Sequence, residues 1–349
     1  MGRCGAGGPV GQGDVVSRRR VLLTGGSSLL VRRTAEGLDR RGDQVVLLQR
    51  RRVDIDVDQV LGDVRDPDVV QRAVTGCDAV IHAAAKVGVT GRWDEYRSIN
   101  IDGTSVVLDA ARRAGIGSVV HVSTPSVAHS GSSVVGAIAE PPVTGRPVSG
   151  RVGSFYAESK AQAERLALAE ADDGLAVVAI RPHLVWGPGD TQLVGRIVER
   201  ARSGRLALVG GGTALVDTTY VDNAASALVA ALDAAHPGAR CSGRAYVIAN
   251  GEPRPVRELV EAILRAAGVD ARPRRVPLRV AALAGSVTER VWSFRRTDTE
   301  PPLTRFLAEQ LGTAHWFDPR PARDDLGWSP SVSLDEGFTA LAHWFASHR

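Results

Sequence analysis

RVLLTGGSSLLV, residues 20–31, joins an apolar run to two glycines and then to a helical pattern that reaches about Arg41. A strand, turn and helix in this order aim backbone N–H groups and the positive end of the helix dipole at a pyrophosphate. The segment therefore predicts a dinucleotide-binding loop with Gly25, Ser27, Ser28 and Leu29 as cofactor-binding residues. A plain strand-to-helix turn is the alternative that this segment alone leaves open.

Two positions of the loop depart from the usual glycine-rich pattern. Ser28 and Val31 stand where small residues normally allow close backbone approach and tight helix–strand packing. Each adds a Cβ, and the branched Val31 crowds a first helical turn. We therefore expect strain in this loop, and we expect glycine at both positions to tighten NADPH binding.

Short runs rich in β-branched residues alternate with helical patterns along the first half of the chain. The strand candidates are Arg20–Thr24, Val45–Leu48, Val60–Leu61, Ala79–Ile81, Val119–Val122 and Leu175–Ile180, and the helix candidates include Val106–Ala114 and Tyr156–Ala171. Strands alternating with helices predict a parallel sheet covered on both faces. The expected fold is α/β, a Rossmann-type doubly wound sheet over residues 20–185.

The alternation of strand and helix patterns is less regular after residue 186. Helix candidates at Val194–Ala201, Asn223–Ala234 and Val256–Ala267 alternate with short strands at Thr218–Val221 and Ala245–Ile248. We expect residues 186–349 to form mainly a smaller lobe that closes over the sheet and selects the substrate. Within it, Val280–Val287 is apolar and follows several arginines; its length favours a buried helix over contact with a membrane surface.

The composition narrows the class of protein. A net charge of +4 with scattered basic residues gives no support to nucleic-acid binding. No apolar run approaches the roughly 18 residues of a membrane span, and the Gly-rich residues 1–19 predict a disordered tail rather than a signal peptide. Three distant cysteines without metal-ligand spacing fit a reducing compartment, so we expect a cytoplasmic protein without a metal site.

Tyr156 and Lys160 form the clearest catalytic pattern. Spacing of i, i+4 places the phenol and the ammonium on one face of a helix. A neighbouring cation favours the phenolate, so that the tyrosine can exchange a proton with an alcohol or a carbonyl. Lys86 and Lys160 are the only lysines among 43 basic residues, which makes chance occurrence of the pattern less common.

Hydroxyl groups follow the strand that ends near Val122. The segment His121-Val122-Ser123-Thr124-Pro125-Ser126-Val127 lies where a carboxyl strand end faces a cofactor cleft. A hydroxyl there can hydrogen-bond the substrate oxygen beside Tyr156. A hydroxyl-rich turn without chemistry is the alternative reading of this segment by itself.

The second strand ends in Gln49-Arg50-Arg51-Arg52. NAD-selective sites usually place an acidic residue there for the adenosine ribose hydroxyls. The acid is absent and arginines follow, which suits a 2′-phosphate. We therefore expect NADP(H) in preference to NAD(H), with Arg50 as a binding residue.

These motifs resemble those of the extended short-chain dehydrogenase/reductases, and within them the 3β-hydroxysteroid dehydrogenase/isomerase-like branch of the NAD-dependent epimerase/dehydratase superfamily. The resemblance runs from about Arg20 to the C-terminus. It also rests on Gly62-Asp63-Val64-Arg65-Asp66, His82-Ala83-Ala84-Ala85, Asn100-Ile101-Asp102-Gly103-Thr104, Arg181-Pro182-His183-Leu184-Val185-Trp186-Gly187-Pro188-Gly189 and Tyr220-Val221-Asp222-Asn223-Ala224.

The resemblance implies a role for individual residues. Tyr156 would act as the acid/base, Lys160 would bind the nicotinamide ribose, Thr124 would be the catalytic hydroxyl with Ser123 as its neighbour, and Asn100 would support the catalytic geometry. The remaining cofactor-binding positions would be Asp63, Val64, Ala83, Ala85, Pro182 and Val185. A homodimer is a further expectation from the family.

Two positions bear on the substrate. Nucleotide-sugar enzymes of the superfamily carry an Asn and an Arg that contact the sugar diphosphate, where this chain has Leu184 and Val216. Without charge-assisted contacts a diphosphate would bind poorly. The segments STPSV (residues 123–127) and AAAKVG (residues 83–88) resemble those of sterol dehydrogenases and 2-alkyl-3-oxoalkanoate reductases. We therefore expect alcohol/ketone redox on a small apolar substrate.

Two alternatives stay open. A nucleotide-sugar epimerase or reductase would use the same fold and catalytic pair. A degenerate cofactor-sensing protein would explain the eroded glycine loop, although it would have no need of the pair Tyr156 and Lys160.

Overall fold

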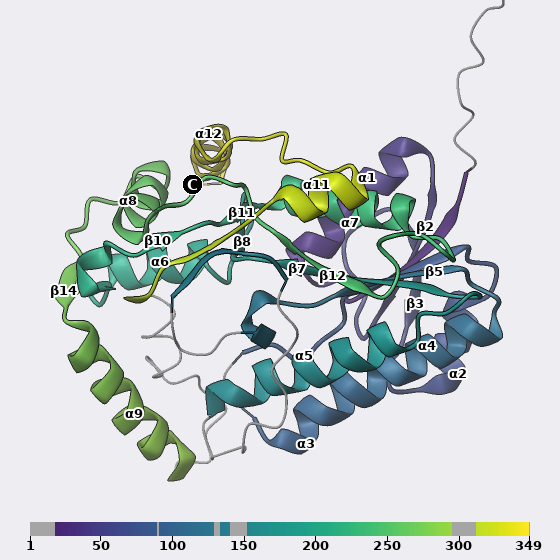
Figure 1. Cartoon of the computed structure of the whole chain (residues 1–349). Helices are drawn as coiled ribbons and strands as arrows, with labels where there is room; N and C mark the ends of the chain where they lie inside the picture. The colour runs from purple at the N-terminus through teal and green to yellow at the C-terminus, as the bar shows by residue number, and fades with distance from the viewer. Residues whose placement is uncertain (1–17, 89–90, 129–132, 140–151, 295–311, 349) are drawn as a thin grey trace, which may run out of the picture.

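A seven-stranded parallel sheet forms the centre of the computed structural model, which describes residues 18–88, 91–128, 133–139, 152–294 and 312–348 (Figure 1). Its order is β12-β7-β5-β4-β1-β2-β3. The strands are β1 (Arg20–Thr24), β2 (Gln44–Gln49), β3 (Asp58–Leu61), β4 (Ala79–His82), β5 (Ser118–Val122), β7 (Ala176–Pro182) and β12 (Arg244–Ile248). The chain changes direction across the sheet between β1 and β4, which is where such sheets bind their ligands. The predicted Rossmann-type fold is confirmed.

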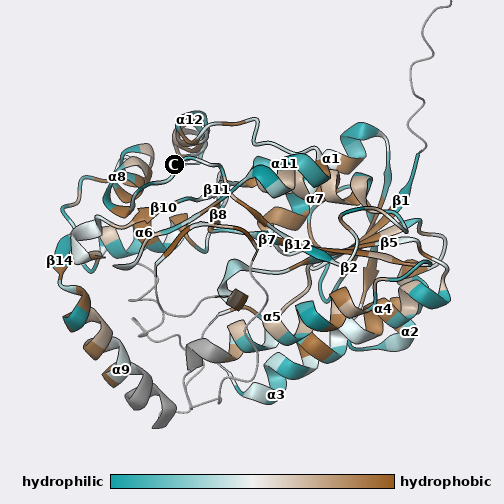
Figure 2. Ribbon diagram, in the orientation of Figure 1, coloured by the Kyte–Doolittle hydropathy of each residue, from teal (hydrophilic) through white to brown (hydrophobic). Residues whose placement is uncertain are grey.

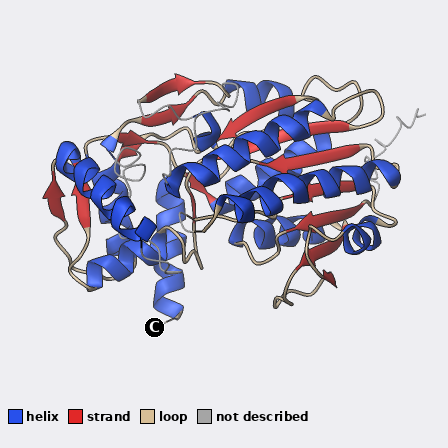
Figure 3. Ribbon diagram, turned by 90° about the horizontal axis from the view of Figure 1, so that it is seen from below, coloured by secondary structure: helices blue, strands red, loops and turns tan. Residues whose placement is uncertain are grey.

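Apolar side chains lie on both faces of the sheet, because the strands are largely continuous apolar runs and successive side chains of a strand point to opposite sides. In β1, Val21 and Leu23 pack in one core and Leu22 in the other. One face is covered by α1 (Leu29–Arg41), α7 (Val221–Ala234) and α11 (Arg320–Leu326), the other by α2 (Pro67–Val74), α4 (Gly103–Arg113) and α5 (Val152–Ala169). Figure 2 shows apolar residues concentrated in the strands, and Figure 3 shows α4 and α5 lying side by side along one face.

The chain after residue 185 contributes to two parts of the molecule. β12 pairs with β7 at the edge of the main sheet, and α7 packs against α1. The sequence pattern for Ala245–Ile248 correctly predicts a strand, but the strand completes the Rossmann sheet instead of lying in the smaller lobe. The sequence pattern did not indicate that this strand pairs with β7, because periodicity carries no information on pairing partners.

The smaller C-terminal region contains a four-stranded sheet, two two-stranded sheets and helices (Figure 1). Its strands, with β6 from the first half of the chain, are β6 (Val134–Ala137), β8 (Val185–Trp186), β9 (Ala207–Val209), β10 (Leu215–Val216), β11 (Thr219–Tyr220), β13 (Arg254–Pro255), β14 (Arg274–Val276) and β15 (His315–Phe317). Its helices are α6 (Val194–Arg202), α8 (Val256–Ala266), α9 (Leu278–Phe294) and α12 (Leu334–Ser347). α6, α8 and α12 share one apolar core.

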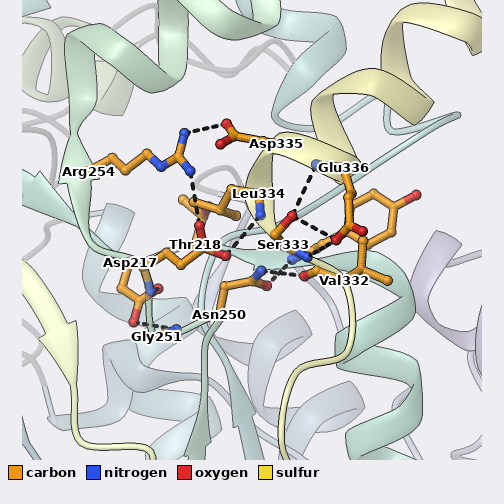
Figure 4. Close-up of polar contacts among 12 residues, drawn as sticks. Asp217, Thr218, Asn250, Gly251, Arg254, Val332, Ser333, Leu334, Asp335 and Glu336 are labelled. Carbon is orange, nitrogen blue, oxygen red and sulfur yellow. Dashed lines mark hydrogen bonds and ion pairs between the residues drawn. The ribbon is translucent and has the colours of Figure 1, made fainter.

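Asn250 joins the end of the main sheet to this region. Its Oδ1 accepts the backbone N–H of Tyr220 at 2.9 Å, and its Nδ2 donates to the carbonyl of Val332 at 2.8 Å (Figure 4). Ser333 and Glu336 then form a capping box at the start of α12. The polar contacts therefore fix where α12 begins relative to the sheet.

Asp217 is buried in the same junction (Figure 4). Its carboxylate accepts the backbone N–H groups of Gly251 and Glu252 at 3.1 and 3.2 Å. Burial nevertheless outweighs these bonds and raises the pKa of Asp217 to about 7. The folded protein therefore holds a proton here that an exposed carboxyl would release.

α9 corrects one expectation from the sequence. The segment Val280–Val287 is helical, but it is not buried as a whole: Val280, Leu283 and Val287 are 55%, 68% and 55% exposed, while Ala281 is buried. Spacing of three and four residues puts the exposed apolar side chains on one face of the helix. None of the described helices is long and apolar enough to cross a membrane.

Candidate active site

Helix α5 carries Tyr156 and Lys160 across the carboxyl end of β5. Lys160 is 3% exposed, and its Nζ donates to the carbonyl of Val122, the last residue of β5, at 2.5 Å. Tyr156 lies one turn earlier on the same face of the helix and remains partly accessible. The two residues thus lie at the edge of the sheet where the fold binds ligands.

Thr124 lies directly against Tyr156. The Thr124 hydroxyl contacts the Tyr156 hydroxyl and lowers the pKa of the phenol. It also accepts the backbone N–H of Ser126 at 3.3 Å and lies 3.3 Å from the Ser126 hydroxyl. Ser123 is buried instead, and its backbone N–H donates to the carbonyl of Ile180 at 2.6 Å. The structure therefore brings Thr124, and not its neighbour Ser123, to the phenol.

The protonation of this pair differs from the sequence-based expectation. Burial raises the pKa of Tyr156 to about 12, and the hydrogen bond from Thr124 lowers it only in part. Burial also lowers the pKa of Lys160 to about 8, while Glu164 raises it. The expected stabilisation of the phenolate by Lys160 is therefore wrong for the chain by itself, because desolvation dominates the balance.

Asn100 fastens the loop after β4 to α5. It lies in a π-helix (Arg97–Asp102) between α3 (Trp93–Tyr96) and α4. Its Oδ1 accepts the backbone N–H of Lys86 at 2.6 Å, and its Nδ2 donates to the Ser159 hydroxyl at 2.9 Å. Because Ser159 directly precedes Lys160, Asn100 contributes to the placement of the lysine.

Gly25 makes the close approach that a dinucleotide loop requires. Its φ is +86°, and a Cβ there would lie 3.0 Å from the backbone N and Cα of Ala84. Thr24 holds these strand ends together, since its Oγ1 accepts the N–H groups of Ala83 and Ala84 at 3.1 and 3.0 Å. The loop therefore passes against the backbone at the end of β4, where Ala83 and Ala85 are partly accessible.

A buried polar chain below the loop was not identified from the sequence. Because Thr24 Oγ1 already accepts two N–H groups, its O–H donates to His82 Nδ1 at 2.8 Å. His82 Nε2 then donates to the Thr104 hydroxyl at 3.0 Å, and Thr104 donates to the carbonyl of Asn100 at 2.6 Å. Burial lowers the pKa of His82 to about 3, in agreement with this neutral tautomer. No local pattern connects residues this far apart in the sequence.

Ser28 and Val31 are accommodated without backbone strain, which corrects the expectation of a crowded loop. Ser28 is the N-cap of α1 with an extended backbone (φ −73°, ψ 138°), and Val31 packs in the core between α1 and the sheet. Ser27 and Ser28 are exposed, and the first turn of a helix leaves backbone N–H groups free for an anion. The loop thus keeps its phosphate-binding geometry with only one of the usual glycines.

Two glutamines lie near the end of β2, where the adenosine half of the cofactor is expected to bind. The Gln59 amide is fixed by its bonds to the backbone of Val53 and Ile55. Its Oε1 accepts from Gln49 Nε2 at 2.6 Å, which turns the buried Gln49 Oε1 toward Gly26. This oxygen has no hydrogen-bond partner in the described part of the chain, so it fits a donating ribose hydroxyl.

Arg50 and Asp63, the charged residues predicted to bind the adenosine half of the cofactor, lie near the end of β2. Arg50 is exposed at the end of β2. Asp63 pairs with Arg65 at 2.8 Å, and this pairing, with a further contribution from Arg50, holds the pKa of Asp63 below its usual value. Val64 is buried beside Gly103. The buried acceptor, the glycine cradle and the helix N-terminus together fit a nicotinamide dinucleotide.

Leu184 has an unusual backbone conformation. Its φ is +44°, and it is the only residue other than glycine with a positive φ among those described. Pro182 and Val185 lie on either side, at the end of β7 and the start of β8, and both are partly accessible. Val216 is buried in β10 and offers nothing to a ligand. Leu184 therefore places an apolar side chain where nucleotide-sugar enzymes carry an amide.

A small cavity of about 60 Å³ lies beyond Ser126, at the carboxyl end of β7. Apolar side chains form most of its wall, together with two buried histidines and the buried Arg181. Its lining includes Ser126, Val134, Ala137, Ile138, His183, Val247, His315 and Phe317. The sequence analysis missed His183, His315 and Phe317 as site residues, because the last two come from β15, far from the other motifs in the sequence.

Comparisons with known proteins identify the family of this chain. The model of the 3-beta hydroxysteroid dehydrogenase/isomerase family matches residues 29–279. A 2-alkyl-3-oxoalkanoate reductase of Stenotrophomonas maltophilia is 46% identical over 326 residues, which cover 92% of this chain and 98% of that protein. A 3 beta-hydroxysteroid dehydrogenase/Delta 5-->4-isomerase of Mycobacterium tuberculosis is 31% identical over 348 residues, covering 94% and 90%.

Solved structures share the fold. MoeE5 in complex with UDP-glucose and NAD superposes with a TM-score of 0.69 at 25% identity, covering 94% of this chain and 99% of that chain. A UDP-glucuronic acid 4-epimerase from Bacillus cereus in complex with NAD gives 0.70 at 20% identity, with the same coverage. The chain thus belongs to the 3-beta hydroxysteroid dehydrogenase/isomerase family of extended short-chain dehydrogenase/reductases, and it is an NAD(P)-dependent oxidoreductase that acts on a CH–OH group or the corresponding ketone.

Proposed function

We propose that this protein reduces the ketone of an apolar β-keto acid of the 2-alkyl-3-oxoalkanoate type to an alcohol. The hydrogen bond between Thr124 and Tyr156, with Lys160 one turn further along α5, is the observation that carries the proposal. The name of the 46% identical relative supports this substrate class. A 3β-hydroxysteroid is the second candidate, supported by the relative at 31% identity.

The protonation of Tyr156 is compatible with the reductive direction. With a pKa near 12 the phenol keeps its proton at neutral pH. It can therefore act as the general acid that protonates the carbonyl oxygen, while the Thr124 hydroxyl holds that oxygen in place. The bound nicotinamide supplies the hydride. The Lys160 ammonium lies at the end of β5, where it would bind the nicotinamide ribose.

The cofactor proposed here is NADP(H). Arg50 is exposed beside Asp63, with no acidic residue at the end of β2 to repel a 2′-phosphate. Gln49 Oε1 does not discriminate, because the ribose 3′-hydroxyl that it can accept from is present in both cofactors. Gly25, Ser27, Ser28 and Leu29 would hold the pyrophosphate, and Ala83, Ala85, Pro182 and Val185 would line the nicotinamide half.

The substrate proposal depends on the absence of partners for a diphosphate. Leu184 and the buried Val216 supply neither charge nor hydrogen bonds, whereas the cavity beyond Ser126 has an apolar wall. These features support an alkyl chain over a nucleotide sugar. The degenerate cofactor-sensing alternative leaves the preserved set of Thr124, Tyr156 and Lys160 without a purpose.

The decisive experiment combines cofactor binding and turnover. Fluorescence titrations with NADPH and NADH would be followed by assays with a 2-alkyl-3-oxoalkanoate, a 3β-hydroxysteroid and UDP-glucose. We expect NADPH oxidation with the β-keto acid and neither binding nor turnover of UDP-glucose at millimolar concentration. A calorimetric signal from UDP-glucose would contradict the substrate proposal, and no binding of either cofactor would favour the degenerate alternative.

Two interactions remain proposals. The family predicts a homodimer, which sedimentation equilibrium would test. The exposed face of α9, with Val280, Leu283 and Val287 next to the exposed Arg279, suits a weak contact with an anionic membrane surface. Co-sedimentation with anionic vesicles that Leu283→Asp does not reduce would contradict contact through this helix.

A further inference from the structure

Three strands place polar side chains under α5. The pairing of β4, β5 and β7 aligns His82, His121 and Ala179 in one row. Arg181 lies two residues after Ala179, so it points to the same face of the sheet as His121. This face is the one covered by α4 and α5, since His82 contacts Thr104 of α4 and Arg181 contacts Glu164 of α5.

Glu164 and Arg181 form a fully buried ion pair. Their side chains are 0% and 1% exposed. Arg181 Nε donates to Glu164 Oε2 at 2.8 Å, and a second contact joins the other guanidinium nitrogen to Oε1. A buried pair of this kind is weak evidence for stability, because the cost of removing both charges from water is comparable to their attraction. Its position on α5 offers another explanation.

Glu164 lies about one helical turn after Lys160 and about two turns after Tyr156. Residues at i, i+4 and i+8 share one face of a helix. The described titratable and charged groups around Lys160 are Tyr156 and Glu164 on α5, His82 on β4, His121 on β5 and Arg181 on β7. Within this described set, Glu164 is the anion that faces the buried ammonium.

The neighbouring groups act on Lys160 in opposite directions. Burial lowers the pKa of Lys160 and Glu164 raises it. Burial, followed by the charge of Lys160, lowers the pKa of both His82 and His121, so both rings stay neutral and add no charge. Arg181 holds the Glu164 carboxylate through two bonds, which fixes its orientation.

We propose, building on the function proposed above, that Glu164 is a positioning residue that keeps the Lys160 ammonium charged at the active site, and that Arg181 holds Glu164 for this purpose. The ion pair thus serves the reaction through Lys160. Arg181 contributes to the wall of the cavity beyond Ser126, whereas Glu164 does not. A charge at about 6 Å in a partly buried site corresponds to roughly one to two pH units in the titration of its neighbour.

The chain offers a direct test, because Lys86 and Lys160 are its only lysines. Protein labelled with 13C at the lysine Cε gives two NMR signals, and Lys86→Arg identifies which signal belongs to Lys160. We expect Lys160 in Glu164→Gln to titrate one to two pH units lower than in the wild type, with Lys86 unchanged. The alkaline limb of kcat for ketone reduction should move by the same amount.

Two further variants, a double variant and a control, complete the test. Glu164→Gln removes the carboxylate that pairs with the buried Arg181 and can fail to fold. Glu164→Leu with Arg181→Met therefore removes both charges, and it should also lower the Lys160 titration. Glu170→Gln is the matched control: it breaks an exposed ion pair with Arg112 just beyond the same helix and should change neither readout.

A folded variant without Glu164 whose Lys160 titrates as in the wild type would overturn the proposal. So would a lowered titration with an unmoved pH profile of kcat, since the charge would then not matter to the reaction. If Lys160 titrates lower but the wild type turns over none of the substrates tested, the pairing of Glu164 with Lys160 stands and the proposed function fails.

Discussion

Gly25→Ala tests whether the cofactor loop depends on close contact with the end of β4. Gly25 has a φ of +86°, and an added Cβ would lie 3.0 Å from two backbone atoms of Ala84. These atoms cannot move away easily, because Thr24 holds the N–H groups of both Ala83 and Ala84. The methyl group must therefore displace the loop itself.

Two costs add in this variant. A left-handed conformation costs an alanine roughly 1 kcal/mol, and overpacking against backbone costs about 1–3 kcal/mol. The expected loss is about 2–4 kcal/mol, divided between the free energy of unfolding and the free energy of cofactor binding. If the loop moves, its N–H groups no longer point at the pyrophosphate, and NADPH affinity should fall roughly ten- to several-hundredfold.

Gly42→Ala is the matched control. Gly42 has a φ of +94°, but nothing lies within 4 Å of its ideal Cβ, so this variant carries the conformational cost without the clash. Urea denaturation and NADPH fluorescence titration would be measured for both variants. The reasoning is refuted if Gly25→Ala is no less stable than Gly42→Ala and binds NADPH as tightly as the wild type.

Four further predictions follow from the site and its surroundings. Tyr156→Phe should abolish turnover and leave NADPH affinity within a few-fold; more than a tenth of wild-type turnover would contradict its role as acid. Arg50→Asp should weaken NADPH and spare NADH, and unchanged constants for both would reject the cofactor proposal. Ser28→Gly with Val31→Gly should leave NADPH affinity unchanged but lower the melting temperature, because Val31 packs in the core; tighter binding would show that the loop is strained after all. Asp217 has a pKa raised to about 7 by burial, against 3.8 for the exposed group, so between these pH values the unfolded chain releases a proton that the folded protein keeps, and stability falls as pH rises. Asp217→Asn should lessen that fall between pH 3.8 and about 7, and parallel melting curves for the two proteins would exclude this origin.

The sequence was sufficient for the elements that build the sheet and its first helix. Arg20–Thr24 is β1 exactly as expected, and the helix that follows ends at Arg41. These segments are predictable because a strand buried on both faces needs a continuous apolar run, which few other structures require. The motif containing Tyr156 and Lys160 was equally predictable, because a helix fixes the geometry of residues four apart.

Other features depend on contacts between distant segments and left no local pattern. His315 and Phe317 reach the cavity beside Ser126 from β15, and β12 joins the sheet beside β7. The exposed face of α9 was read as buried, because an apolar segment has the same composition whether or not other segments cover it. Strand pairing and burial are properties of the folded chain that a pattern within one segment does not carry.

The titration of Tyr156 shows the same limit in its clearest form. Spacing of i, i+4 correctly places the Lys160 ammonium one turn from the phenol, and from this proximity a lowered phenol pKa was expected. Burial acts in the opposite direction and raises the pKa of Tyr156 to about 12, and the hydroxyl that partly opposes this rise is that of Thr124. The difference has a chemical consequence, because a phenol with a raised pKa is a weaker acid and loses its proton only at higher pH. Oxidation of an alcohol needs the phenolate of Tyr156, whereas reduction uses the protonated phenol that is present at neutral pH, so turnover in the oxidative direction should rise with pH more steeply than turnover in the reductive direction.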